Sequence, residues 1–207
     1  TDAQNSAFER GHGFEEIAKT QLRILQALGV EELDIVSQSL GAFTGAQVAR
    51  FASEFGIQVK HALLTETPGV IDASLSEMFL KRFAPENPLV SLHHATALDP
   101  ELMKKVNPIK KTYRDLKWLA RGVFQGKGLK YGAEVSKKNL EGVLEGALTN
   151  NPDMQMTLIN GSESQVAPNE ETGQMVSSLQ NKGFKDRLSY TVFPGGSHVV
   201  MEQPKRY

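Results

Sequence analysis

The sequence contains no cysteine. This absence excludes disulfide bonds, thiol nucleophiles and cysteine-ligated metal sites, although it does not by itself fix the cellular compartment. No stretch approaches the roughly 18–20 consecutive apolar residues of a membrane span, and no charged-then-apolar leader is recognisable. No membrane span is therefore expected, and the cytoplasm is the expected location.

Net charge is also nearly absent. The 207 residues include 23 Lys and Arg against 24 Asp and Glu, for a formal charge of −1. With 40% hydrophobic and 23% charged residues, the composition is that of an ordinary globular protein. The length allows one core, or a core with a small subdomain.

Helix and strand patterns alternate along the first third of the chain. Apolar residues recur at helical spacing over 14–28, and Gly29 is a stop signal. The apolar run 33–37 predicts a strand that is buried on both faces. A helix rich in small residues and a second strand are predicted at 41–55 and 59–65. This order implies a parallel sheet with crossover connections.

The middle and the end of the chain differ from each other. Between Thr67 and Asn151 the pattern is helical, is interrupted by prolines and contains no convincing strand. A third strand is predicted at 154–160, a helix near 169–182 and a fourth strand at 187–193.

A serine-containing turn, Ser37–Gly41, lies between the first strand and the second helix. A serine raised on a tight strand-to-helix turn needs small residues two positions before and after it. The helix beginning at Leu40 offers N–H groups and a positive dipole end to a developing oxyanion. This is the geometry of the GxSxG nucleophile elbow, and the match here is SxSxG because Ser37 stands in place of the first glycine. A plain loop with Ser39 as helix N-cap is the alternative.

A histidine, His198, follows the last predicted strand in the sequence FPGGSH. A loop histidine at this place can reach a serine at the sheet edge. It would accept the serine proton during attack and return it to the leaving group. Taken alone, it is better explained as a surface residue, but its pairing with the upstream serine turn favours a catalytic role.

Together, these motifs resemble the α/β-hydrolase family. The matching order is a strand, SQSLG and a helix; a strand ending in a carboxylate; a helical insertion; a strand followed by GSESQVAP; and a strand followed by GGSHVVMEQP. The resemblance runs over nearly the whole chain. It implies an α/β fold with a parallel sheet, a partial core formed by 1–67 and 151–207, and a helical lid or cap at 68–150.

The resemblance also implies roles for individual residues. Ser39 would be the nucleophile, His198 the base, and the Leu40 N–H one donor of the oxyanion hole. A serine nucleophile implies an acyl-enzyme, and thus esters, thioesters or activated amides as substrates. We expect a carboxylesterase-like serine hydrolase with a small acyl substrate, no cofactor and no metal.

The triad acid has two candidates. The family's usual position, after the strand that carries GSESQVAP, holds Ser164, with Glu163 one residue earlier. A second position, used by haloalkane dehalogenases and some lipases, lies at the end of the preceding strand and holds Glu66. Either carboxylate is chemically sufficient, because it only orients and stabilises the imidazolium. We favour Glu66, which matches without a shift, and keep Glu163 as the alternative.

Part of the family's pattern is missing. The four predicted strands correspond to the family's last four, so the 33–37 strand would form a bare apolar edge. We expect the N-terminal half of the fold, or another chain, to complete the sheet. The tripeptide His12-Gly13-Phe14 mimics the family's oxyanion motif. Because it opens a helix shortly before Ser39, we interpret it as coincidence.

The insertion is strongly basic. Eleven Lys and Arg but only two acidic residues lie between Lys104 and Lys138, interleaved with aromatic residues. This segment could bind an anionic partner, or it could be a solvated lid whose aromatic residues face the acyl pocket. The adjacent His93 and His94 are interpreted as structural or solvent-facing rather than metal-binding.

Two other functions compete with the hydrolase. The first is a catalytically impaired binding or scaffold module of the same fold, whose basic lid contacts an anionic partner. The second is a doubly wound nucleotide-binding protein. It is disfavoured because the sequence has neither a GxGxxG nor a GxxxxGK[ST] motif.

Overall fold

The computed structural model describes residues 12–74, 77, 132–135, 137 and 139–196. Helices and strands alternate along these residues. In chain order they are α2 (Gly13–Ala27), β1 (Glu32–Gln38), α3 (Leu40–Phe51), η1 (Ala52–Phe55), β2 (Gln58–Thr65), α9 (Leu140–Asn150), β3 (Gln155–Gly161), α10 (Asn169–Leu179), η3 (Gln180–Phe184) and β4 (Leu188–Phe193). Each strand and helix predicted outside the 68–150 segment is therefore present, with ends within three residues of those predicted when α3 and η1 are taken together.

The four strands form one parallel sheet in the order β1-β2-β3-β4. Each strand pairs with the next one along the chain, and helices make the crossovers between them. Gln38 pairs with Thr65, and Gly161 pairs with Phe193. The carboxyl ends of the strands therefore meet at one edge of the sheet. The predicted parallel sheet with crossover helices is confirmed.

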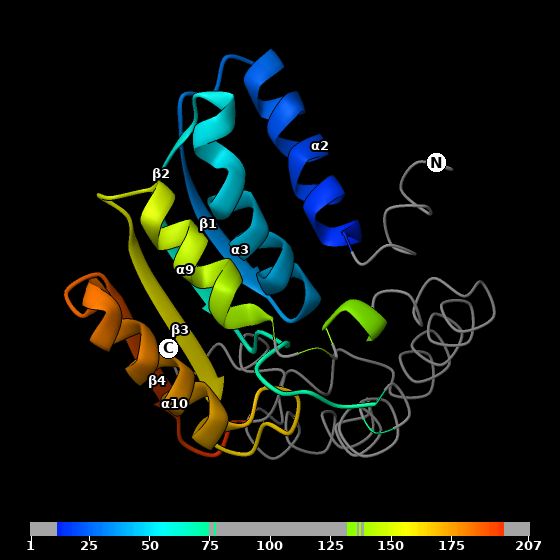
Figure 1. Ribbon diagram of the computed structural model, residues 1–207, viewed down its shortest axis with the longest axis vertical. Helices are drawn as coiled ribbons and strands as arrows, with labels where there is room; N and C mark the ends of the chain where they lie inside the picture. Colours follow the sequence, from blue (N-terminus) through cyan, green and yellow to red (C-terminus); the bar gives the residue numbers. More distant parts are fainter. Residues whose placement is uncertain (1–11, 75–76, 78–131, 136, 138, 197–207) are drawn as a thin grey trace, which may run out of the picture.

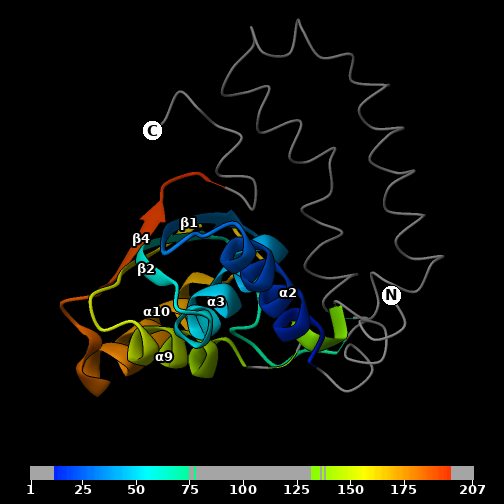
Figure 2. The ribbon, with the colours of Figure 1, turned by 90° about the horizontal axis from the view of Figure 1, so that it is seen from above.

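The helices α2, α3, α9 and α10 all lie on the same face of the sheet (Figures 1 and 2). In β1, Ile35 faces this layer and is buried, whereas the next residue, Val36, has 64% of its surface exposed. The prediction that β1 is buried on both faces was therefore wrong. Within the described residues the helices cover one face only, so successive side chains alternate between the core and the surface.

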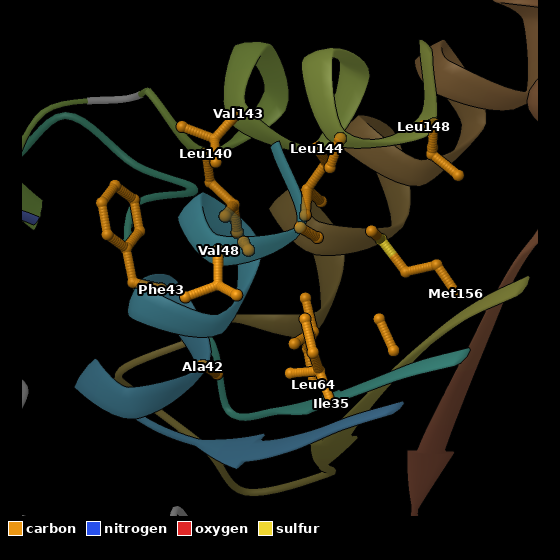
Figure 3. Close-up of a cluster of buried hydrophobic side chains, with 14 of the residues drawn as sticks. Ile35, Ala42, Phe43, Val48, Leu64, Leu140, Val143, Leu144, Leu148 and Met156 are labelled. Atoms are coloured by element: carbon orange, nitrogen blue, oxygen red, sulfur yellow. The ribbon is translucent and has the colours of Figure 1, made fainter. Parts of the chain in front are cut away.

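The core lies between the sheet and this helical layer (Figure 3). From α9, Leu140, Leu144 and Leu148 are fully buried over α3 and the strands. Burying a leucine side chain contributes about 1.5–3 kcal/mol, so α9 is bound tightly to the sheet. Phe14 of α2 packs edge-to-face on Phe43 of α3, with ring centroids 5.0 Å apart.

The segment expected to form a lid, 68–150, ends in α9, which belongs to the helical layer described above. Most of that segment, including His93, His94 and much of the basic stretch, lies outside the described residues. The division into a core and a lid therefore stays a prediction. Within the described ranges, no helix has both the length and the apolar character needed to cross a membrane.

Candidate active site at the carboxyl edge of the sheet

Ser39 occupies a sharp turn between β1 and α3. Its backbone angles are φ 56° and ψ −131°, a combination that residues other than glycine rarely adopt and that is often found at functional sites. The Ser39 N–H donates to the Thr65 carbonyl at 2.9 Å, and its own carbonyl accepts the N–H of Ala42 at 2.9 Å. These bonds fix the turn to β2 on one side and to the first turn of α3 on the other.

Close packing beneath this turn requires a small residue at Gly45. The sequence had indicated Gly41 instead. A Cβ added to Gly45 would lie 2.5 Å from Ser37 Oγ and 2.9 Å from Ile35 Cγ2. A Cβ on Gly41 would meet nothing within 4 Å among the described residues. The contact between α3 and β1 is therefore tightest at Gly45, one helical turn after the SxSxG motif.

The helix α3 begins at Leu40, immediately after Ser39. The first N–H groups of a helix have no partner within the helix, and its dipole places partial positive charge at this end. The Leu40 amide therefore lies next to the serine in an environment suited to a developing negative charge.

Glu66 follows β2 directly and is fully buried. Its φ is 53°, the second positive value of a non-glycine residue in the described part of the chain. The Glu66 N–H donates to the Ile159 carbonyl at 2.9 Å, and its carboxylate accepts the N–H of Gly161. Because Gln38 pairs with Thr65, Ser39 and Glu66 are at adjacent strand ends, and neighbouring strands are about 4.8 Å apart.

The alternative acid, Glu163, has an exposed side chain. Its backbone N–H donates to the Gly196 carbonyl at 2.8 Å. The next residue, Ser164, is buried, and its hydroxyl accepts the Ala167 N–H at 3.3 Å. Ser164 thus stabilises a local turn.

The loop after β4 is attached to the same region. Ser162 Oγ accepts the Gly195 N–H at 2.8 Å, and the Ser162 N–H donates to the Phe193 carbonyl at 2.9 Å. These contacts hold the end of β4 and Gly195 beside the loop that follows β3. His198 lies outside the described residues, so its role stays a prediction.

The tripeptide His12-Gly13-Phe14 opens α2, and its N–H groups bind a carboxylate. Glu134 Oε2 accepts the Gly13 N–H at 2.9 Å, and Oε1 accepts the Phe14 N–H at 3.2 Å. Burial raises the pKa of Glu134, and Glu15 acts in the same direction, whereas the two backbone hydrogen bonds and His12 oppose the shift. The tripeptide therefore has a helix-capping contact.

A partly buried polar network next to Glu66 was not foreseen from the sequence. Tyr190 Oη donates to Asn169 Oδ1 at 2.7 Å, and Asn169 Nδ2 donates to the Gly161 carbonyl at 3.0 Å. Asn160, only 2% exposed, donates to the Ala167 carbonyl at 2.9 Å. An asparagine that follows Met156 and Leu158 on the core-facing side of β3 was the available signal, because a buried amide needs partners.

No group of three or more His, Asp or Glu residues that could hold a metal ion occurs in the part of the chain that the structure describes.

No family model matches the sequence, and no curated protein matches it. Solved structures do. A serine hydrolase from the polyaromatic hydrocarbon-degrading bacterium Cycloclasticus zankles is 18% identical, with a TM-score of 0.60 over 94% of this chain and 67% of its own. A carboxylesterase structure from the thaumarchaeon Nitrososphaera gargenis is 14% identical, with a TM-score of 0.54 over 93% and 67%. A bromoperoxidase from Bacillus anthracis is 16% identical, with a TM-score of 0.54 over 89% and 67%.

These similarities concern the fold, because all three identities are low. The chain spans about two thirds of the length of each of these structures. The parallel sheet, its crossover helices and the structural similarity together show that this chain has the α/β-hydrolase fold.

Proposed function

We propose that the protein is a serine hydrolase that cleaves a carboxylic ester or thioester through an acyl-enzyme. The observation that carries the proposal is the backbone of Ser39, whose φ of 56° and ψ of −131° project the side chain from a strand-to-helix turn. A plain N-capping serine has extended backbone angles, and Ser39 makes no side-chain capping bond to α3. This backbone geometry supports the proposal that Ser39 is the nucleophile.

In the proposed reaction, Ser39 Oγ attacks the acyl carbon while His198 accepts its proton. The alcohol or thiol leaves with that proton, and water then hydrolyses the acyl-serine by the same route. The Leu40 N–H donates to the oxyanion of both tetrahedral intermediates.

Glu66 is the proposed triad acid, and its burial and position support this role better than those of Glu163. Its carboxylate is at the strand end adjacent to Ser39 and is removed from water. The side chain of Glu163 is exposed, and a solvated carboxylate orients an imidazole less well because water competes for it.

Fluorophosphonate labelling read by intact mass tests the proposal. The natural full-length protein should gain one adduct, and Ser39→Ala and His198→Ala should gain none. The hydrolase proposal is wrong if the full-length protein gains no adduct.

The second candidate is a binding module of the same fold that does not hydrolyse esters. One observation favours it: the family's usual acid position holds Ser164, which is buried and binds the Ala167 N–H. Its partner would be an anionic molecule that binds the basic segment between Lys104 and Lys138. This binding-module hypothesis predicts no fluorophosphonate adduct on Ser39 in the labelling experiment.

A further inference from the structure

Gly161, the last residue of β3, is held through both of its backbone polar groups. Its N–H donates to the carboxylate of Glu66, and its carbonyl accepts Asn169 Nδ2 at 3.0 Å. Asn169 Oδ1 in turn accepts a hydrogen bond from Tyr190 Oη at 2.7 Å. A continuous chain of hydrogen bonds therefore runs from Tyr190 on β4, through the first residue of α10, to the buried carboxylate.

A second arm stabilises the same chain. Asn160 Nδ2 lies 3.0 Å from Thr172 Oγ1 and 3.4 Å from Tyr190 Oη. Thr172 Oγ1 donates to the Pro168 carbonyl at 2.8 Å. Asn160 and Thr172 are buried, whereas Asn169 and Tyr190 are partly buried. A hydrogen-bond network whose members all have partners restricts the backbone that carries it. The residues on either side of Gly161 are therefore fixed by three elements: β3, α10 and β4.

The Tyr190 hydroxyl keeps its proton in this position. Burial raises the pKa of Tyr190, and the charge of Glu66 acts in the same direction, whereas hydrogen bonds with Asn160 and Thr172 oppose the shift. At neutral pH the hydroxyl is therefore a donor, as the contact with Asn169 Oδ1 requires.

We propose that Tyr190 and Asn169 are positioning residues that hold Gly161, and through it the Glu66 carboxylate, in the orientation needed for catalysis. This inference rests on the proposed function. Neither residue touches the substrate. Their effect comes from the short path to Glu66: a shift of the Gly161 backbone would move the N–H that binds the carboxylate, and a misoriented acid stabilises the imidazolium less.

The test compares Tyr190→Phe with Ser189→Ala in the natural full-length protein. Both changes remove one hydroxyl from β4, but Ser189 bonds Thr157 at 2.9 Å and not the Gly161 network. With p-nitrophenyl butyrate, Tyr190→Phe should lower kcat about 3- to 10-fold, the size of one net hydrogen bond, with KM unchanged. Ser189→Ala should behave as wild type.

The pH profile of fluorophosphonate labelling separates positioning from a merely structural role. In Tyr190→Phe the acidic limb should move to lower pH, because a less stabilised imidazolium loses its proton more readily. A partly unfolded population would lower the rate equally at every pH and leave the limb where it is. A uniform loss of rate without movement of the limb therefore overturns the proposal.

Asn169→Ala provides a second route if Tyr190→Phe folds poorly. Since both residues act on Gly161, the double variant should be no slower than Asn169→Ala alone, whereas independent effects would multiply. If the rate losses of the two single variants multiply in the double variant, the positioning role is wrong. It is also wrong if the pH profile of labelling is the same in Tyr190→Phe and in the wild type. Neither result contradicts the proposed function. A wild-type protein that is not labelled at Ser39 overturns the proposed function and, with it, this inference.

Discussion

The carboxyl edge of the sheet and the outer surface formed by α9 and η3 use carboxylates in opposite ways. At the edge, Glu66 is buried and accepts a backbone N–H from Gly161. On the outer surface, Lys182 Nζ lies 2.7 Å from Glu145 and 3.0 Å from Glu141, and hydrogen bonds with these two carboxylates raise the pKa of Lys182.

The two kinds of contact differ in how strongly they constrain the backbone. Exposed ion pairs are screened by water and contribute little, so the Lys182 pairs can be lost without moving the backbone. A buried carboxylate is costly unless it is bonded, so Glu66 and the backbone that binds it are constrained together.

The largest expected effect is on catalysis. Glu66→Gln keeps an oxygen that can accept the Gly161 N–H but removes the charge that stabilises the imidazolium, so kcat should fall by roughly 10⁴-fold, as loss of a triad acid does elsewhere. Glu163→Gln should stay near wild type. Ester hydrolysis and thermal melting of both variants check this. The reverse ranking would make Glu163 the acid.

The second effect is on stability, and it compares two helical glycines. A Cβ at Gly45 would lie 2.9 Å from Ile35 Cγ2. By contrast, Gly142 on α9 is exposed, and no atom of the described residues lies within 4 Å of a Cβ added there. Gly45→Ala should destabilise the fold by about 1–3 kcal/mol through overpacking. Gly142→Ala should stabilise it by about 0.5–1 kcal/mol.

Urea unfolding measures both glycine variants. Equal changes in the two would show that α3 and β1 have room to separate, and the argument for close packing beneath the Ser39 turn would fail.

The smallest effect concerns the pH dependence of stability at Glu134. Because burial raises its pKa above 4.5, the folded state binds the proton more tightly than the unfolded state. The stability contributed by this group is present below about pH 4.5 and is lost as pH rises through the folded pKa. Glu134→Gln should therefore gain stability relative to wild type as pH rises from 4.5 to 7.

Urea unfolding at several pH values checks this trend, with Glu170→Gln on the exposed side of α10 as the control for losing one negative charge. A Glu134→Gln difference that is constant with pH, or that shrinks as pH rises, contradicts the sign of the Glu134 shift.

The sequence predicted the elements well because each strand is a short apolar run bounded by turn residues. It predicted the burial of β1 wrongly for the same reason: an apolar run such as 33–37 has the same appearance whether helices cover one face or two. Which face of β1 is covered depends on where α2 and α3 pack. The residues of the strand itself do not determine that packing.

The site was predicted in part. The strand-to-helix position of Ser39 follows from local pattern alone. That Glu66 is buried and Glu163 is exposed could not be predicted, because burial depends on how the strand ends and loops pack in three dimensions. The contact of Glu134 with Gly13 joins residues 121 positions apart, and Tyr190 reaches Gly161 through α10. No local pattern encodes such distant pairings.

The most direct test of the central claim is to trap the acyl-enzyme. The natural full-length protein should be mixed with p-nitrophenyl butyrate, quenched in acid within milliseconds and analysed by intact mass and peptide mapping. We expect one butyryl group on the peptide that contains Ser39 in the wild type, and none in Ser39→Ala. Hydrolysis that persists in Ser39→Ala, or a butyryl group on another residue, would contradict it.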